Sequence, residues 1–388
     1  MRNTPLLIGL LTTLALSGCS VSVEDRDEET VPPPAAPPPA PQPPATPPAP
    51  TPPPPAPPAP PAPPAPPVVP ATLEECFGRG GQLVEVDRVF NNDSEDHGAL
   101  VAFALSPERQ LAAAGADGTV KVWTLEGLVG TIASSVLTYG PEVDAAPAVD
   151  LAFHGGRIVV ADTRGLVTSW SVAGDMEVLG GTDPTVAMAA VAFDPTHTWM
   201  AQADARPTGT VMLRRVDGTP AIVGPLETSV ESVSDLAFLP SGALVIAGRD
   251  ASGAVVETRD AADPRSIGAR YASAAWPSMG EVAVAGETVA AVVGGDVVVL
   301  DAAMNERHAT SIRAEGDLRS IALTELGRFA VTADARGVVY VLDTERGAIL
   351  SRLDTRDGAV ASIRIDSPTG LVFAASSSAH IRALACTE

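Results

Sequence analysis

The chain has 388 residues and a formal net charge of -22, with 25 Lys and Arg residues against 47 Asp and Glu residues. This balance argues against a surface for nucleic acids or anionic lipids, because phosphate groups are bound by clustered Lys and Arg. Most of the 38 prolines lie between Pro32 and Pro70. The roughly three hundred remaining residues have an ordinary globular composition and could form one large core.

The N-terminus has the features of an export signal. Met1-Arg2 gives a positive start, and Leu6–Leu16 is an apolar run too short for a stable membrane-spanning helix. The run ends in LSGC (residues 16–19), which resembles the bacterial lipobox. The resemblance implies a signal peptide over residues 1–18 and a lipid on Cys19. Because Ser20 follows this cysteine, the resemblance also implies a location at the outer membrane of a Gram-negative bacterium, on the periplasmic or the cell-surface face. An ordinary secretory peptide with a chance cysteine is the alternative.

The region 19–75 is expected to be a disordered linker. Ser22–Thr30 is acidic without an apolar period, and Pro32–Pro70 is almost wholly Pro and Ala. Such a chain favours polyproline II at about 3.1 Å per residue, so residues 32–70 would reach about 120 Å. This composition predicts a stalk between the lipid and a folded domain. A ligand for a proline-binding module is the other interpretation, but PPAPPAPPAPP lacks the flanking residues that such modules need.

A pattern of three short strands recurs seven times after Leu100. Its first copy, VAFALSPERQLAAAGADGTVKVWTLEG (residues 101–127), has three apolar runs separated by turns. A single copy cannot bury its own faces. The last apolar residues before the first turn of each copy, used below as reference positions, are Leu105, Phe153, Phe193, Phe238, Val284, Leu323 and Ile365. Their spacing of 39 to 48 residues predicts an all-β, seven-bladed β-propeller over residues 76–388.

The repeats resemble the WD-repeat family. Residues 115–123, GADGTVKVW, are similar to that family's second turn and third strand. Other copies keep half of the Trp-Asp pair, as in Trp170 and Asp343. The family's histidine is displaced to His97 and its serine is Ala114, so its buried His–Ser–Asp–Trp network is expected to be absent. The resemblance implies the propeller fold and a protein-binding role.

The ends of the propeller should meet. One extra strand, Leu83–Phe90, precedes the repeats, and the last repeat ends at Glu388 without room for a fourth strand. The N-terminal segment is therefore expected to supply that strand, as it does in the WD-repeat family, and so to remove open sheet edges. Cys76 and Cys386 remain after Cys19, and leftover cysteines of an exported chain are a candidate disulfide. We predict that they bond; free thiols or a metal-binding pair are the alternatives.

The chain lacks the common catalytic and phosphate-binding motifs, so no catalytic residue is predicted. The Gly-Gly pairs at 80–81, 155–156, 180–181 and 294–295 are interpreted as turns. The five histidines are interpreted as turn or surface residues: His97, His154, His197, His308 and His380.

One set of carboxylates is a candidate site. Three residues before the reference positions stand Ala102, Asp150, Ala190, Asp235, Glu281, Ser320 and Ser362. Asp150, Asp235 and Glu281 would place carboxylates from three blades around one mouth of the central channel. They could bind a cation such as calcium, since hard cations take oxygen ligands. They could also contact a basic partner, or be solvated rim residues. No other cofactor is expected.

The favoured function is a protein-interaction scaffold in the cell envelope, tethered to a membrane by its lipid and binding a protein partner. One alternative is an enzyme, a metal-dependent lactonase or esterase that uses the channel-mouth carboxylates. It would also need inward His or Asn residues, which the sequence does not place. Another alternative is a component of outer-membrane protein assembly. Aromatic residues make up only 4% of the chain, which leaves few interface anchors.

Overall fold

The computed structural model describes residues 72–91, 99–126, 131–133, 146–181, 183, 185–218, 221–260, 263, 265–275, 278–312, 317–378 and 380–388. They lie in one compact unit, residues 66–388. No helix among them is long and apolar enough to cross a membrane. The predicted signal peptide, Cys19, the Pro/Ala stalk and His97 lie outside the described residues.

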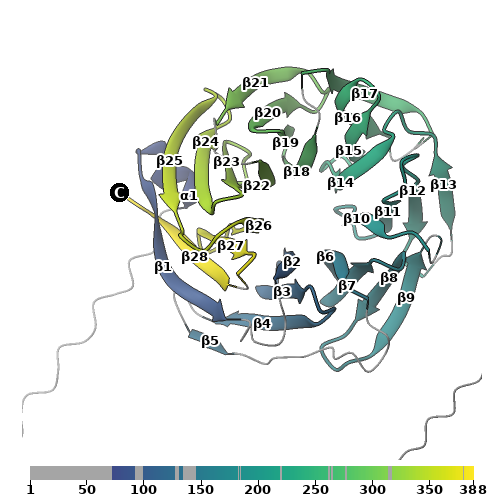
Figure 1. The fold of residues 1–388 in the computed structure, drawn as a ribbon, viewed down its shortest axis with the longest axis horizontal. Helices are drawn as coiled ribbons and strands as arrows, with labels where there is room; N and C mark the ends of the chain where they lie inside the picture. The colour runs from purple at the N-terminus through teal and green to yellow at the C-terminus, as the bar shows by residue number, and fades with distance from the viewer. Residues whose placement is uncertain are drawn as a thin grey trace, which may run out of the picture. The chain divides into compact units, whose positions relative to one another are not determined.

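Seven four-stranded antiparallel sheets form the blades of a ring, preceded by the short helix α1 (Leu73–Gly78) (Figure 1). Blade 1 consists of β2 (Leu100–Leu105), β3 (Gln110–Gly115), β4 (Val120–Glu126) and β5 (Thr131–Ala133). Blade 2 consists of β6 (Ala148–His154), β7 (Arg157–Asp162), β8 (Leu166–Trp170) and β9 (Met176–Gly181). Blade 3 consists of β10 (Met188–Phe193), β11 (Trp199–Asp204), β12 (Val211–Arg215) and β13 (Ile222–Leu226).

Blade 4 consists of β14 (Ser232–Phe238), β15 (Leu244–Asp250), β16 (Gly253–Arg259) and β17 (Ile267–Ser273). Blade 5 consists of β18 (Met279–Ala285), β19 (Thr288–Val293), β20 (Asp296–Asp301) and β21 (Glu306–Ser311). Blade 6 consists of β22 (Leu318–Leu323), β23 (Phe329–Asp334), β24 (Val338–Asp343) and β25 (Ala348–Asp354). Blade 7 consists of β26 (Val360–Asp366), β27 (Leu371–Ser376), β28 (His380–Thr387) and, from the other end of the domain, β1 (Gln82–Asn91).

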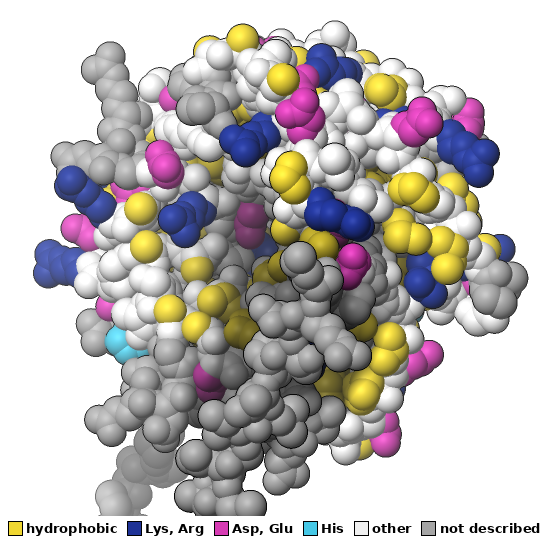
Figure 2. All heavy atoms as spheres, turned by 45° about the vertical axis from the view of Figure 1, so that its right-hand side comes forward, with side chains coloured by type: hydrophobic (Ala, Val, Ile, Leu, Met, Phe, Trp, Pro, Cys, Tyr) yellow, Lys and Arg dark blue, Asp and Glu magenta, His cyan; other side chains and the backbone are white. Residues whose placement is uncertain are grey.

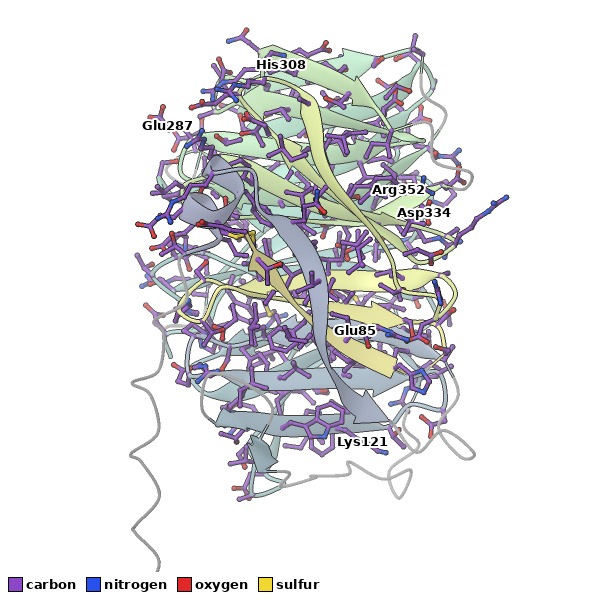
Figure 3. All side chains as sticks on the ribbon, turned by 90° about the vertical axis from the view of Figure 1, so that its left-hand side faces the viewer. Glu85, Lys121, Glu287, His308, Asp334 and Arg352 are labelled. Carbon is purple, nitrogen blue, oxygen red and sulfur yellow. A yellow bond between two sulfur atoms is a disulfide. The ribbon has the colours of Figure 1, made fainter. Side chains whose placement is uncertain are left out.

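Aspartates shape the hairpins between the second and third strands of several blades. In blade 6 the Asp334 Oδ1 atom accepts the N–H groups of Arg336 and Val338, at 2.9 and 3.0 Å. The other Asp334 oxygen accepts the hydroxyl of Tyr340 at 3.0 Å. Gly337 supplies the positive φ, 90°, that this turn requires. Figure 3 shows Asp334 at the end of its strand, with Arg352 nearby on β25. Asp162, Asp204 and Asp250 accept turn N–H groups in the same way.

The core lies between neighbouring blades. One apolar cluster joins blades 7 and 1, because Phe373 and Ile381 pack with Phe103 and Leu111 in it. Phe103 and Phe373 are each 1% exposed. Burying a side chain of this size contributes about 1.5–3 kcal/mol relative to leaving it exposed. Since each blade packs against both neighbours, the ring is stabilised as a whole only when its first and last blades meet.

The ring closes through β1, which pairs antiparallel with β28 from Gln82↔Thr387 to Asn91↔His380. The predicted closing strand is confirmed, and it is one residue longer at each end than predicted. Figure 3 shows β1 crossing the edge of the ring, with Glu85 on it. Arg382 on β28 is 2% exposed and forms ion pairs with Glu85 and Asp357. These contacts tie the N-terminal strand to the last blade.

The disulfide Cys76–Cys386 is present, and its Cα atoms lie 6.1 Å apart. It links α1 to β28, beside the β1–β28 pairing. Phe77 on α1 is buried and packs edge-on against Phe329, with ring centroids 5.5 Å apart. Gly81 passes so close that a Cβ atom there would lie 2.4 Å from Cys76 Sγ, so no other residue fits without movement. The predicted disulfide is therefore confirmed, with a glycine that makes room for it.

Candidate functional site

The inner strands bring the three predicted carboxylates together around one cavity. Asp150 on β6, Asp235 on β14 and Glu281 on β18 line a hollow of about 290 Å³. All three residues are partly exposed to this cavity, but the inner strands of the ring surround them and keep most bulk water away. Arg364 on β26, the inner strand of blade 7, lines the same cavity. The three residues predicted to share the channel mouth thus line one cavity, which also contains a guanidinium group that the sequence analysis missed.

Arg364 could have been found by comparing the repeats. It occupies the position directly before the reference residue of the seventh copy. The other six copies have alanine there: Ala104, Ala152, Ala192, Ala237, Ala283 and Ala322. This position lines the cavity in blades 5, 6 and 7. An arginine there, in place of the alanine of the other copies, is a signal of a functional difference in the last copy.

The carboxylates hold neighbouring blades together. Asp150 Oδ1 accepts the N–H of Leu151 at 2.8 Å, and its Oδ2 accepts the N–H of Val191 on the next blade at 2.8 Å. Asp235 repeats this arrangement with Leu236 and Val282, both at 2.8 Å. In each case the residue of the next blade that donates its N–H lies one position after the residue equivalent to the aspartate in that blade's inner strand.

Glu281 and Ser320 continue the pattern around the ring. Glu281 Oε2 accepts the Ser320 hydroxyl at 2.5 Å and the Ile321 N–H at 3.3 Å. Ser320 Oγ in turn accepts the N–H of Ile363 on blade 7 at 2.8 Å. The seams between blades 2 and 3, 4 and 5, 5 and 6, and 6 and 7 therefore share one kind of polar link. The candidate binding residues have a structural role that the sequence did not indicate.

The electrostatics of the mouth follow from burial among like charges. Burial raises the pKa of Asp150 to about 6. Burial, together with Glu281 and Asp150, raises the pKa of Asp235 well above its usual value. Arg364 Nη1 lies 3.4 Å from Glu281 Oε2. Burial opposes the charge of Arg364, but the three carboxylates outweigh it and raise its pKa. The guanidinium is thus the counterion of the cluster.

The geometry gives little support to a metal in the mouth. Across the described parts of the chain, no three His, Cys, Asp or Glu side chains form a group that could hold a metal ion. The carboxylate oxygens of Asp150 and Asp235 accept backbone N–H groups instead. Binding of a calcium ion or a basic partner at the mouth stays a prediction.

Two histidines that the sequence analysis treated as separate turn residues meet on the surface. His154 ends β6, and His197 lies in the turn between β10 and β11. Their Nδ1 atoms are 3.3 Å apart. The His154 ring stacks on Phe193, with centroids 4.6 Å apart. Burial, with the neighbouring His197, lowers the pKa of His154. His154 directly follows the reference residue Phe153, and His197 lies four residues after Phe193. Both therefore belong to the first turns of consecutive copies, which is the signal that could have paired them.

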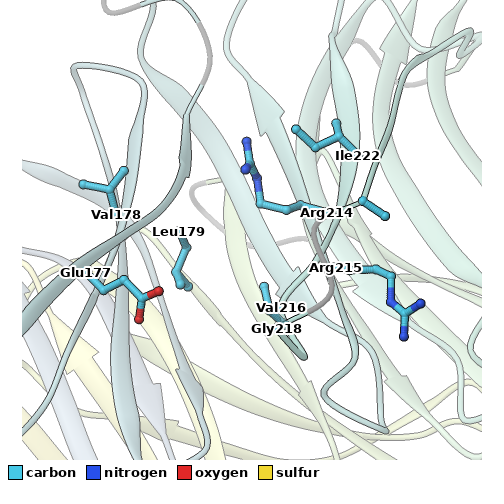
Figure 4. A pocket seen from close by; sticks show the side chains of 9 residues that line it. Glu177, Val178, Leu179, Arg214, Arg215, Val216, Gly218 and Ile222 are labelled. Atoms are coloured by element: carbon cyan, nitrogen blue, oxygen red, sulfur yellow. The ribbon is translucent and has the colours of Figure 1, made fainter.

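A groove on the outer rim separates blades 2 and 3. It has a volume of about 230 Å³ and is lined by Val178 and Leu179 on β9 and by Arg214, Arg215 and Ile222 on β12 and β13 (Figure 4). Figure 2 shows hydrophobic and charged side chains interspersed on the neighbouring surface. Gly180 belongs to β9, so its interpretation as a turn was wrong. A Cβ atom at Gly180 would lie 2.4 Å from Gln202 Oε1 and 3.1 Å from Arg214 Nε, so the glycine leaves space for both side chains.

Comparison with known proteins identifies one repeat directly. A family model described as "WD domain, G-beta repeat" matches residues 90–124, which include β2, β3 and most of β4. No curated protein matches the chain. Blade 1 keeps the family's aromatic residue as buried Trp123, whereas buried Ala114 has no hydroxyl to offer it. With its seven blades, the protein is a WD-repeat-like β-propeller. WD-repeat propellers generally mediate protein–protein interaction, and the fold suggests such a scaffold here.

Equivalent serines in neighbouring blades give a matched test of the inter-blade links. Ser320 Oγ bridges Glu281 and Ile363, whereas Ser362 Oγ is buried without a hydrogen-bond partner. We expect Ser320→Ala to lower the free energy of unfolding by about 1–3 kcal/mol, because it leaves buried polar groups unpaired. Ser362→Ala should change it by less than about 0.5 kcal/mol. Urea denaturation followed by circular dichroism measures both, and equal losses would contradict the structural role.

The channel mouth should also make stability depend on pH. Folded Asp150 has a pKa of about 6, whereas an unfolded aspartate titrates near about 4. Between these values the folded protein binds more protons, so this contribution is lost as the pH rises. Asp150→Asn should flatten the curve of unfolding free energy between about pH 4 and 6.

The control is Asp183→Asn at an exposed carboxylate. Hydrogen bonds from Thr185 lower the pKa of Asp183, so it is ionised throughout this window, and its replacement should leave the slope unchanged. Urea titrations at closely spaced pH values provide the measurement. A slope that Asp150→Asn does not alter would show that the carboxyl titrates normally.

Proposed function

We propose that the protein is a non-catalytic scaffold of the cell envelope, which binds an extended acidic and apolar segment of a partner protein at the groove between blades 2 and 3. The lipid on Cys19 would hold it to a membrane, and the Pro/Ala stalk would separate the propeller from that membrane. The observation that carries the binding role is the groove, where exposed apolar side chains adjoin an arginine without a protein partner.

The apolar part of the groove comes from two outer strands. Val178 on β9 is 57% exposed and Ile222 on β13 is 53% exposed. Met176, on the same strand as Val178, is 46% exposed. Large apolar side chains that face water on adjacent elements mark interaction surfaces when polar residues surround them. Covering Val178 and Ile222 would release ordered water and favour binding.

The charged residues of the groove are Arg214, Arg215 and Glu177, so its cations outnumber its single carboxylate. The Arg214 side chain makes no hydrogen bond or ion pair within the described part of the chain, and its Nε atom is buried without a partner. Arg215 is already paired with Asp217 and lies over the Trp199 ring, 5.6 Å from its centroid. A carboxylate of the partner would therefore accept a charge-assisted hydrogen bond from the Arg214 guanidinium.

The backbone of the groove suits an extended ligand. Within the described sheets β9 pairs only with β8, and β13 only with β12, so each is the outer edge of its blade. An edge strand presents unpaired N–H and C=O groups, and a peptide can add to it as a further strand. Since side chains alternate along a strand, the fitting segment alternates apolar and acidic residues.

The tether rests on the sequence of the N-terminus. The LSGC run places a cysteine directly after two small residues, and the Pro/Ala region favours polyproline II, as described above. A lipid-anchored propeller on such a spacer fits the outer membrane of a Gram-negative bacterium. Assembly of outer-membrane proteins is a narrower version of this function and would require the partner to belong to that machinery.

Changes in the groove should weaken binding of an acidic peptide. The probe is a fluorescent ten-residue peptide that alternates Val or Ile with Asp or Glu, and fluorescence anisotropy gives its Kd. We expect Ile222→Asp and Arg214→Glu each to weaken binding at least about tenfold, since they remove an apolar anchor and reverse a charge. Ile349→Asp is the matched control, because Ile349 is 42% exposed on the outer strand of blade 6.

The same peptide with Lys in place of its acidic residues tests the charge. It should bind wild-type protein weakly and the Arg214→Glu variant better. Equal affinities for the wild type and all three variants, or a preference for the Lys peptide, would rule out this groove as the binding site.

Replacement of the lipidated cysteine should release the protein from membranes. We expect wild-type protein to co-sediment with the membrane fraction and to incorporate labelled palmitate. Cys19→Ser should lose the label and move to the soluble fraction, because the thiol that carries the lipid is absent. Recovery of Cys19→Ser in the membrane fraction would mean that another part of the protein attaches it.

A further inference from the structure

We propose that His154 and His197 form a binding site for a divalent transition-metal ion on the seam between blades 2 and 3. Their Nδ1 atoms lie 3.3 Å apart. Two imidazole nitrogens that each lie 2.0–2.1 Å from a tetrahedral ion are separated by about 3.3–3.4 Å. The pair is therefore already spaced as two ligands of one ion, with the other coordination positions open to water or to a ligand from a partner.

The ring of His154 and the backbone of His197 are held by their surroundings. The backbone of His154 pairs with Arg157 at the β6–β7 hairpin, and its ring stacks on Phe193, 4.6 Å between centroids. His197 has a φ of 55°, in a turn whose N–H bonds to the Asp194 carbonyl at 2.8 Å. A site whose ligands are fixed before binding loses less conformational entropy when the ion arrives.

The Asp194 carboxylate fixes the turn rather than serving as a third ligand. Its Oδ1 atom accepts the N–H groups of Thr198 and Trp199 at 2.7 and 2.6 Å, and its Oδ2 atom accepts the N–H of Thr196 at 3.2 Å. Its negative charge also acts on the His154 ring. A nearby carboxylate favours a bound cation without coordinating it.

The chemistry of the pair limits the metal. Two neutral imidazoles with open positions suit copper, zinc and nickel, whereas calcium and magnesium require oxygen ligands. Among the suitable ions Cu²⁺ should bind most tightly. The competing explanation of the 3.3 Å distance is a simple hydrogen bond from one imidazole to the other, which would need no ion.

Calorimetric titration with CuCl₂ and ZnCl₂, on protein purified without a histidine tag, tests the site. We expect one Cu²⁺ per chain that His154→Gln and His197→Asn each weaken at least about tenfold, because a single ring replaces a chelating pair. Asn is chosen at position 197 because it tolerates positive φ. His380→Gln, in blade 7, is the control and should bind as wild type does. Copper binding unchanged in both pair variants would show that the contact is only a hydrogen bond.

Electron paramagnetic resonance of the wild-type copper complex does not depend on how the variants fold. Two equivalent nitrogen couplings on one Cu²⁺ are the expected result. A signal with one nitrogen or none, or a titration in which CaCl₂ competes with Cu²⁺, would overturn the assignment.

Discussion

The fold depends on joining the two ends of the propeller domain. Each blade packs on two neighbours, so an open ring would expose the faces of blades 1 and 7 and the edge of β28. Pairing of β1 with β28 covers that edge, and Cys76–Cys386 fixes the same junction covalently. The chain-entropy account makes a link between residues so far apart worth about 5–6 kcal/mol at most. Every seam and surface described above relies on this closure.

Much of the architecture could be predicted because it is periodic. The seven reference positions, from Leu105 to Ile365, fix the inner strands, and Leu83–Phe90 gave the closing strand. The outer strands were harder to recognise. The strand β9 (MEVLGG) is exposed over its first half, so it lacks the alternation of a strand with one buried face, and Gly180 within it indicated a turn. Gly180 is set by the close approach of Gln202 and then Arg214 from the next blade, contacts that no local pattern contains.

The candidate site was predicted in position but not in role. The repeat alignment placed Asp150, Asp235 and Glu281 around one mouth, yet their bonds to the next blade depend on how inner strands align across a seam. Arg364 stands where the other six copies have alanine, so it was visible as an exception, whereas His154 and His197 stand at positions that vary from copy to copy. The groove required the structure, since Val178 and Ile222 become neighbours only through the packing of two blades. The proposed scaffold role therefore depends on the closed ring and on the groove between blades 2 and 3.

Hydrogen–deuterium exchange of the oxidised protein, followed by mass spectrometry, tests the closed ring most directly. If β1 completes blade 7, the amides of β1 and β28 should exchange as slowly as those of β15 and β16 in the middle of the ring, because all require global unfolding. Reduction of the disulfide should accelerate exchange in β1 and β28 first. Exchange of β1 in the oxidised protein several orders of magnitude faster than that of β15 would contradict the account.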